Sequence, residues 1–406
     1  MPANWREVKR YRGGVIYRLL WYSVFFIICS SKTVCAAGNA DESVLPDSVY
    51  ADLEYILSSV TAETDVDPGS VSGIVDFVRA VPVGTSYTLA ERDGSKGAFH
   101  AFTISRGFSD FITYAFNPAI PTYVTMPSSL QDHRWLLPAV ENEHRSMIAD
   151  REISDSMEQV RVLQGRESET ITPDINTGGY YSYEQDRLLW FLPDPAGPIL
   201  ISAAIQDDAS DIGKKGCVIG EDGNWEYLFS EEPGLTKGGL GWADTFMYRA
   251  SSVSIYVSDN ASGTIRAGSF KWLNAGWAKI NMVKSHHILN GIKRFASDFK
   301  SILESQNLPE IEAISDRYQE LLSKSAEELR LLVAPYLDTL KRSDKLEQCA
   351  NGFPGLVTSG EYLEQMGNRE LIRIILLKYL KDTLDGDRYG RIGLYANPAP
   401  PSPLDS

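Results

Sequence analysis

Long apolar runs are scarce in this sequence of 406 residues. The apolar run from Leu19 to Cys29 covers 11 residues, whereas a helix that spans a membrane needs about 20. This scarcity excludes a protein with several membrane spans. The composition is 43% apolar and 23% charged, which is typical of a folded globular protein and excludes a disordered or collagen-like chain.

Basic residues are fewer than acidic residues, and six of them lie within residues 1–36. The chain has 39 Lys and Arg against 54 Asp and Glu, for a formal charge of −15. Basic residues precede the apolar run and Ala36-Ala37 follows it, which is the order of a secretory signal peptide. We predict a signal peptide over residues 1–37, cleaved near Ala37 or Gly38, and a periplasmic or secreted protein. The alternative is a segment kept as an uncleaved anchor.

Cleavage would make the chain more acidic. Loss of residues 1–36 removes six basic residues and one acidic residue, which changes the formal charge from −15 to −20. Such a surface repels phosphate backbones and anionic headgroups. We therefore expect no nucleic-acid partner and no integral membrane span after cleavage. The expected partners are an apolar small molecule or lipid, or another protein of the cell envelope.

Cysteine is rare, with four residues in the chain. Two lie in the predicted signal peptide, which leaves Cys217 and Cys349 in the mature protein. An even pair in an oxidising compartment favours a disulfide. Two separate buried thiols are the alternative, and the spacing does not decide between them.

The usual catalytic and metal-binding motifs are missing. We find no G-x-S-x-G, H-E-x-x-H, P-loop or G-x-G-x-x-G sequence, and the spacing of the histidines fits no zinc site. We interpret His133 and His144 as surface residues and His100 as a hydrogen-bonded core residue. We expect no metal and no cofactor.

The periodicity of apolar residues predicts an α+β fold. It indicates an α+β domain over 42–305, in which strands of residues 180–273 form an antiparallel sheet covered by a long helix over 276–305. Residues 139–179 are charged and are interpreted as an insertion, with a loop at 166–179. A helical segment over 308–386 and a Pro-rich tail over 387–406 follow.

Large aromatic residues gather before the long helix. They suit an apolar pocket, although they also fill ordinary cores. Asn281 and Ser285 fall on the expected apolar face of the helix, where a cavity with a polar spot would explain them. Hydrogen bonds to a neighbouring carbonyl would explain them equally well. The candidate ligand-binding residues are therefore Trp242, Trp272, Trp277, Asn281, Ser285 and Phe295.

The order of elements carries a family resemblance. A first helix, an antiparallel sheet and a long helix introduced by Gly268-Ser-Phe-Lys-Trp-Leu-Asn-Ala-Gly-Trp277 resemble the helix-grip order of START-like lipid-transfer domains. The resemblance covers residues 42–305. It implies that the final helix lies across a curved sheet and closes a cavity for a lipid or another apolar ligand.

Three functions remain open on the sequence. The first is an exported protein that binds or carries an apolar ligand such as a lipid. The second is a structural or partner-binding envelope protein without a small ligand. The third is a secreted hydrolase, which would require His, acidic and hydroxyl side chains that converge in a cleft.

Overall fold

The computed structural model describes residues 45–62, 67–149, 152–206, 208–236, 243–349 and 352–384. The predicted signal peptide, the whole Pro-rich tail and Trp242 lie outside these residues. The fold is α+β, with a large antiparallel sheet and with most of the helices in the C-terminal part.

A nine-stranded antiparallel sheet forms the centre of the fold. Its strands follow one another in the order β1 (Ser86–Arg92), β2 (Ser95–Ile104), β11 (Thr264–Trp277), β10 (Thr245–Asp259), β7 (Ile199–Gln206), β6 (Ser182–Leu192), β4 (Arg161–Ile171) and β3 (Leu130–Trp135), and the short β12 (Ile280–Asn281) pairs with β11. Most of these strands come from residues 161–277, and β1 and β2 extend the sheet beside β11.

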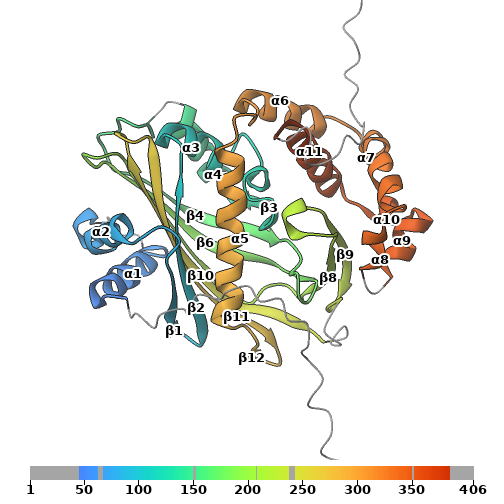
Figure 1. Cartoon of the computed structure of the whole chain (residues 1–406), viewed down its shortest axis with the longest axis horizontal. Helices are drawn as coiled ribbons and strands as arrows, with labels where there is room; N and C mark the ends of the chain where they lie inside the picture. The colour runs from blue at the N-terminus through green and yellow to red at the C-terminus, as the bar shows by residue number, and fades with distance from the viewer. Residues whose placement is uncertain are drawn as a thin grey trace, which may run out of the picture. The chain divides into compact units, whose positions relative to one another are not determined.

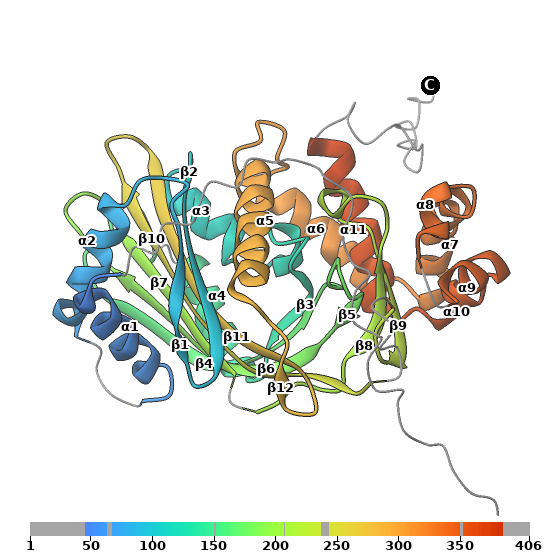
Figure 2. The same cartoon turned by 60° about the horizontal axis from the view of Figure 1, so that its bottom comes forward.

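One face of the sheet is an apolar core under two N-terminal helices, α1 (Asp47–Ser59) and α2 (Ser72–Ala80). Alternate residues of β10 and β11 point to this face, as in any strand. Val253, Ile255 and Phe270 are fully buried there against the two helices. Figure 2 shows α1 and α2 on one side of the sheet and α5 on the other.

The opposite face is covered by α5 (Ser285–Leu303), which we had expected to begin near residue 276. The chain stays in the sheet for longer because Ala278 and Lys279 adopt positive φ angles and make a two-residue turn between β11 and β12. Such a turn matches the twist of a hairpin. In Figure 1, α5 crosses in front of the strands. Its buried residues pack on β2 and β11, together with α3 (Phe108–Ala115).

The segment that we interpreted as an insertion contributes to the sheet. Residues 139–149 belong to α4 (Pro138–Ala149), and β4 runs through much of the expected loop at 166–179. Glu167 and Glu169 made this segment look like a solvated loop. They point instead to one buried face of β4, where other charged side chains pair with them.

The C-terminal part is helical and packs against a second, three-stranded sheet. That sheet consists of β5 (Gly179–Tyr180), β8 (Lys214–Val218) and β9 (Tyr227–Pro233). The helices are α6 (Ile311–Leu322), α7 (Ala326–Leu340), α8 (Asp344–Glu347), α9 (Phe353–Ser359), α10 (Glu361–Gln365) and α11 (Asn368–Leu384), and short 3-10 turns lie at Pro68–Val71, Thr122–Val124 and Asp222–Asn224. One hydrophobic cluster runs from α5 into α6, α7 and α11.

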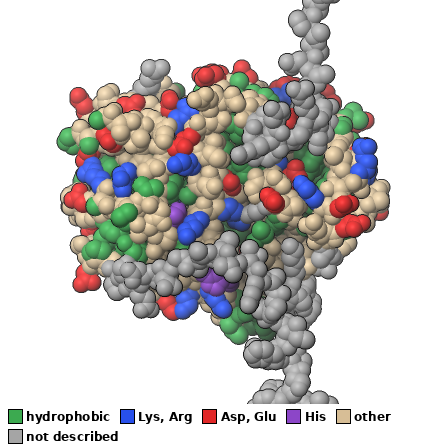
Figure 3. All heavy atoms as spheres, in the orientation of Figure 1, with side chains coloured by type: hydrophobic (Ala, Val, Ile, Leu, Met, Phe, Trp, Pro, Cys, Tyr) green, Lys and Arg blue, Asp and Glu red, His purple; other side chains and the backbone are tan. Residues whose placement is uncertain are grey.

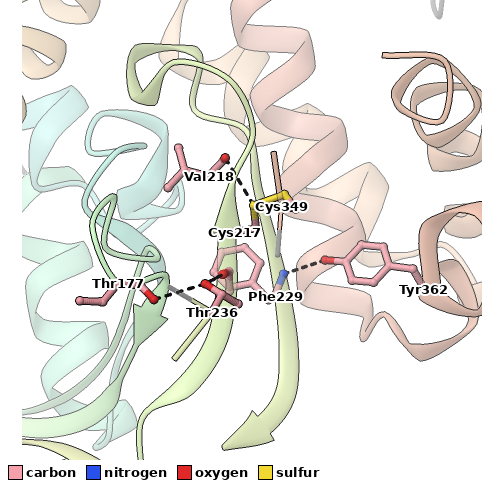
Figure 4. The surroundings of a disulfide bond; sticks show 8 residues. Thr177, Cys217, Val218, Phe229, Thr236, Cys349 and Tyr362 are labelled. Carbon is pink, nitrogen blue, oxygen red and sulfur yellow. Dashed lines mark hydrogen bonds between the residues drawn. A yellow bond between two sulfur atoms is a disulfide. The ribbon is translucent and has the colours of Figure 1, made fainter. Parts of the chain in front are cut away.

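A disulfide joins this helical part to the second sheet (Figure 4). Cys217 on β8 and Cys349 have Cα atoms 5.8 Å apart and are bridged over a sequence separation of 132 residues. Close by, the hydroxyl of Tyr362 accepts a hydrogen bond of 2.8 Å from the backbone N–H of Phe229. The bridge fixes the segment between α8 and α9 to β8, and the hydrogen bond links α10 to β9.

Candidate functional site

A cavity of about 860 Å³ lies between the inner face of the large sheet and α5. Strands β3, β4, β6, β7, β10 and β11 supply its floor, and α6 and α11 add residues at one end. The size falls within the range of about 300–1,000 Å³ that is usual for pockets that hold small molecules.

Small side chains on the floor create this space. Ser202, Ser254 and Ser269 are directly opposite one another on the neighbouring strands β7, β10 and β11. On the other face of β10 and β11, large residues such as Phe270 fill the core. A serine is too short to reach α5, so the row of hydroxyls leaves a gap beneath the helix.

The wall opposite the floor is the apolar stripe of α5. Ile288, Gly291, Ile292 and Phe295 all line the cavity, as the spacing of three and four residues on a helix requires. A Cβ atom added at Gly291 would have no neighbour within 4 Å. The helix therefore leaves open space at its middle, directly over the cavity.

A network of buried charges occupies the floor towards β4 and β6. Arg187 contacts Glu167 through its Nη2 atom at 2.5 Å and through its Nε atom at 2.8 Å, and it reaches Glu169 at 3.2 Å. Gln185 donates to Glu167 at 2.7 Å, and the hydroxyl of Tyr183 donates to Glu169 at 2.7 Å. Burial would raise the pKa of Glu167, but the charge of Arg187 outweighs it and holds this pKa well below its usual value.

His133 extends the network to a hydroxyl group. Its Nε2 atom lies 2.9 Å from Glu167, and its Nδ1 atom lies 3.0 Å from the Oγ1 atom of Thr122. Burial alone would lower the pKa of His133, but the negative charge of Glu167 raises it above the usual value. All three residues line the cavity.

The oxygen and nitrogen atoms of His133, Glu167 and Glu169 lie within 4.8 Å of one another, which is close enough to share a metal ion. Arg187 is already bonded to both carboxylates. A cation would have to compete with a guanidinium group that satisfies the same oxygen atoms. The donor set therefore fits an ion-pair network better than a metal centre.

The interpretation of His133 and His144 as surface residues is wrong. His133 is partly buried in the network, and His144 is only 4% exposed. Neither ring nitrogen of His144 has a hydrogen-bond partner in the described part of the chain, and its ring packs edge-on against Trp135. Burial lowers the pKa of His144 to about 4. His100 is buried and contacts Ser86 at 3.0 Å, as expected for a hydrogen-bonded core residue.

The predicted ligand-binding residues divide into two groups. Trp277 and Phe295 line the cavity. Trp272 points to the opposite face, where it is buried in the core under α1 and α2 and donates to the carbonyl of Ala90. Asn281 and Ser285 are not among the residues that line the cavity, because Asn281 belongs to β12 and Ser285 is the first residue of α5, one turn before Ile288.

The charged floor is not evident from the sequence, because residues 166–171 of β4 have the composition of a loop. Glu167 and Glu169 on β4, and Gln185 and Arg187 on β6, alternate with period two and face the same cavity. Charged residues at alternate positions normally mark the solvated face of a strand. The signal that could have revealed the site was the same alternation in two neighbouring strands, with opposite charges.

The chain matches no model of a known protein family, and it has no significant match among curated proteins. Within the described residues, no helix has both the length and the apolar character that a membrane span requires. On the face shown in Figure 3, acidic and basic side chains are interspersed.

Proposed function

We propose that this protein binds an amphipathic small molecule in the cavity beneath α5. The observation that carries the proposal is the two-sided lining, with Ile288, Ile292 and Phe295 on the wall and serines and paired charges on the floor. Apolar walls with a few placed polar groups are typical of small-molecule sites. The apolar body of the ligand would lie along α5, and its polar end would face the floor.

The arrangement of the elements supports the helix-grip interpretation of the fold. The long helix follows the last strands of the sheet, lies on the face opposite α1 and α2, and borders the cavity. In a helix-grip domain the helix closes the cavity in this way. The C-terminal helices α6 and α11 would be an addition to that plan.

We also propose that the protein works outside the cytoplasm. The disulfide between Cys217 and Cys349 supports this location, because such bridges persist in oxidising compartments. A free-thiol assay on unreduced, denatured protein tests both the disulfide and the removal of residues 1–37. A chain without residues 1–37 would show no free thiol, and a chain that keeps them would show those of Cys29 and Cys35.

The ligand proposal is tested by filling the cavity from Gly291. We expect Gly291→Phe to place a ring in the open space and to abolish the binding of a neutral apolar dye, N-phenyl-1-naphthylamine. Gly291→Ala is the matched control, because it removes the same glycine and leaves the space open. We expect the control to bind dye and to be more stable by roughly 0.5–1 kcal/mol, since glycine weakens a helix interior.

Two results would count against the ligand proposal. Unchanged dye binding by Gly291→Phe would show that the dye sits elsewhere. Failure of the wild-type protein to bind the dye would show that the cavity does not admit apolar molecules. Thermal unfolding of both variants checks that they remain folded.

A series of hydrogen bonds that links three side chains favours a second function. The Thr122 hydroxyl, the His133 ring and the Glu167 carboxylate are connected by hydrogen bonds of 3.0 and 2.9 Å. A hydroxyl, an imidazole and a carboxylate in this order form the general arrangement of a nucleophile with its base. We propose hydrolysis of an acyl ester at Thr122 as the alternative to simple binding.

This alternative predicts slow hydrolysis of p-nitrophenyl esters by the purified protein. Thr122→Val keeps the shape of the side chain but removes the hydroxyl, so it should abolish the hydrolysis and leave dye binding intact. Equal rates in the wild type and the variant would contradict the hydrolase and leave the binding proposal unaffected.

A further inference from the structure

Lys271 stands out among the cavity residues because, within the described residues, its amine has no hydrogen-bond or ion-pair partner. It lies on the cavity side of β11, opposite Ser252 on β10 and Ala98 on β2. Its ammonium group makes no hydrogen bond or ion pair with any residue in the described part of the chain, and α5 covers this part of the sheet.

The acidic residues of the floor are already occupied by other groups. Glu167 accepts bonds from Arg187, Gln185 and His133. The two oxygen atoms of Glu169 accept from Arg187 and Tyr183.

Arg187 itself is nearly saturated, because it also donates to Ser202 at 3.1 Å. The oxygen atoms of both carboxylates are therefore engaged by other donors, and Lys271 is left without a direct hydrogen-bond or ion-pair partner among the described residues.

A charged group that lies in a cavity without a direct partner lowers the stability of the protein until a group of opposite charge binds to it. Arg187 and Lys271 lie in the same row across the sheet, separated by Ala204 and Ser252 on the strands between them. The side chains in the middle of this row are small, so an incoming group has room to reach the ammonium from within the cavity.

The geometry points to a carboxylate ligand: we propose that Lys271 binds the anionic headgroup of an apolar monocarboxylic acid whose tail lies along α5. This inference rests on the proposed binding function and names its ligand class. The neighbours favour this orientation, because Leu273 follows Lys271 on the same face of β11 and packs with Ile288 and Ile292 of α5. The headgroup would thus sit at the floor, with apolar surface beside it.

The charges around Lys271 also favour the binding of an anion. Burial lowers the pKa of its amine; the charge of Glu169 opposes this shift, and the charges of Arg187 and Arg294 add to it. A bound carboxylate would raise this pKa again, because an opposite charge favours the protonated amine. Binding of the acid should therefore weaken as the pH rises through the pKa of the free protein's amine.

The test compares an acid with the matching alcohol. Dodecanoate and dodecan-1-ol compete with N-phenyl-1-naphthylamine on the wild type and on Lys271→Met, which keeps the length of the side chain and removes the charge. We expect the variant to weaken dodecanoate about tenfold to a hundredfold, the range for a hydrogen bond to a charged group. Its affinity for dodecan-1-ol should change less than about twofold, since the alcohol carries no charge.

Two further variants make the result specific. Lys271→Arg retains the charge and should keep most of the affinity for the acid. Lys293→Met removes an exposed lysine of α5 that does not line the cavity, and it should leave both ligands unaffected. Lys271→Met should also be at least as stable as the wild type without ligand, because it removes an unpaired charge.

The possible failures differ from one another. If Lys271→Met weakens the acid and the alcohol equally, or weakens neither, the carboxylate inference is wrong while the cavity still binds apolar molecules. If neither the dye nor either competitor binds the wild type, the proposed function fails and the inference falls with it.

Discussion

Two titratable side chains, His144 in the core and Lys271 in the cavity, have no hydrogen-bond or ion-pair partner in the described part of the chain. His144 is the clearest case, because its ring is enclosed next to Trp135 and neither nitrogen is bonded within the described residues. A histidine in such a place is held neutral. The protein must therefore lose stability when the solvent drives protonation of the unfolded chain.

We predict that His144 makes folding sensitive to acid. Its pKa is lowered to about 4 from an ordinary value of 6.5. The unfolded chain therefore binds the proton first, and stability falls as the pH decreases from 6.5 towards 4. The expected loss is about 3 kcal/mol over this window, at about 1.4 kcal/mol per pH unit.

Denaturant unfolding of His144→Leu at several pH values measures this effect. The variant should gain stability relative to the wild type as the pH falls, and the same change at the exposed His286 should not. A constant difference between His144→Leu and the wild type from pH 7 to pH 4 would show that His144 is not the acid-sensitive group.

The carboxylate of Glu167 acts in the same direction over a different range. The pKa of Glu167 is held low by Arg187 and His133 against the effect of burial. Its contribution to stability is therefore present above the ordinary pKa of about 4.3 for a glutamate and is lost as the pH falls through the lower folded-state value. Because this window begins below that of His144, the two effects can be separated.

At the level of single elements, α5 has two kinds of buried positions. Phe299 is fully buried and contacts Phe111 edge-on, whereas Phe295, one turn earlier, is partly buried and lines the cavity. The ring centroids of the two residues are 5.0 Å apart. They therefore form a matched pair on one helix, with a packed environment for one and an open environment for the other.

We predict that the two phenylalanines differ in their cost of truncation. Phe299→Ala should destabilise the protein by about 3–5 kcal/mol, because it opens a void in a packed core. Phe295→Ala should cost clearly less, since it enlarges a space that already exists, and it should weaken dye binding more than folding. Thermal unfolding and dye titration of both variants measure this. Equal costs would indicate that the core at Phe295 is as tightly packed as the core at Phe299.

Elements with strong local signals could be predicted from the sequence. The Ser-x-x-Glu spacing of Ser325 and Glu328 is typical of a capping box. The two residues form one at the start of α7, with bonds of 3.3 and 2.8 Å between side chains and backbone. The Gly-rich stretch after residue 219 connects the paired strands β8 and β9, as its hairpin composition indicates. These features depend on residues only a few positions apart, so the local sequence is enough to predict them.

Elements that depend on distant partners could not be predicted. β4 looks polar along the chain, and only the side chains of β6 and β3 turn Glu167 into a buried residue. In the same way, Trp272 resembles a pocket residue until the register of β11 sends it to the opposite face. The candidate site forms only when distant strands pair, and the periodicity of a short segment does not predict which strands pair or in which register.

For the whole molecule, the central claim is that the space beneath α5 is a ligand site. The claim combines features from separate parts of the chain, namely the serine row of the sheet, the stripe of α5 and the opening at Gly291. The net charge of the chain and its disulfide bear on the compartment in which the protein works, whereas the cavity bears on its function.

Native mass spectrometry of the protein purified from the cells that naturally produce it tests the central claim most directly. The account predicts a fraction of the wild type with one extra mass that dissociates on activation and corresponds to an apolar molecule with an acidic group. Gly291→Ala should carry the same mass, and Gly291→Phe should lack it. A wild-type chain that shows only its own mass, and that takes up neither dodecanoate nor dodecan-1-ol when these are added, would contradict the account.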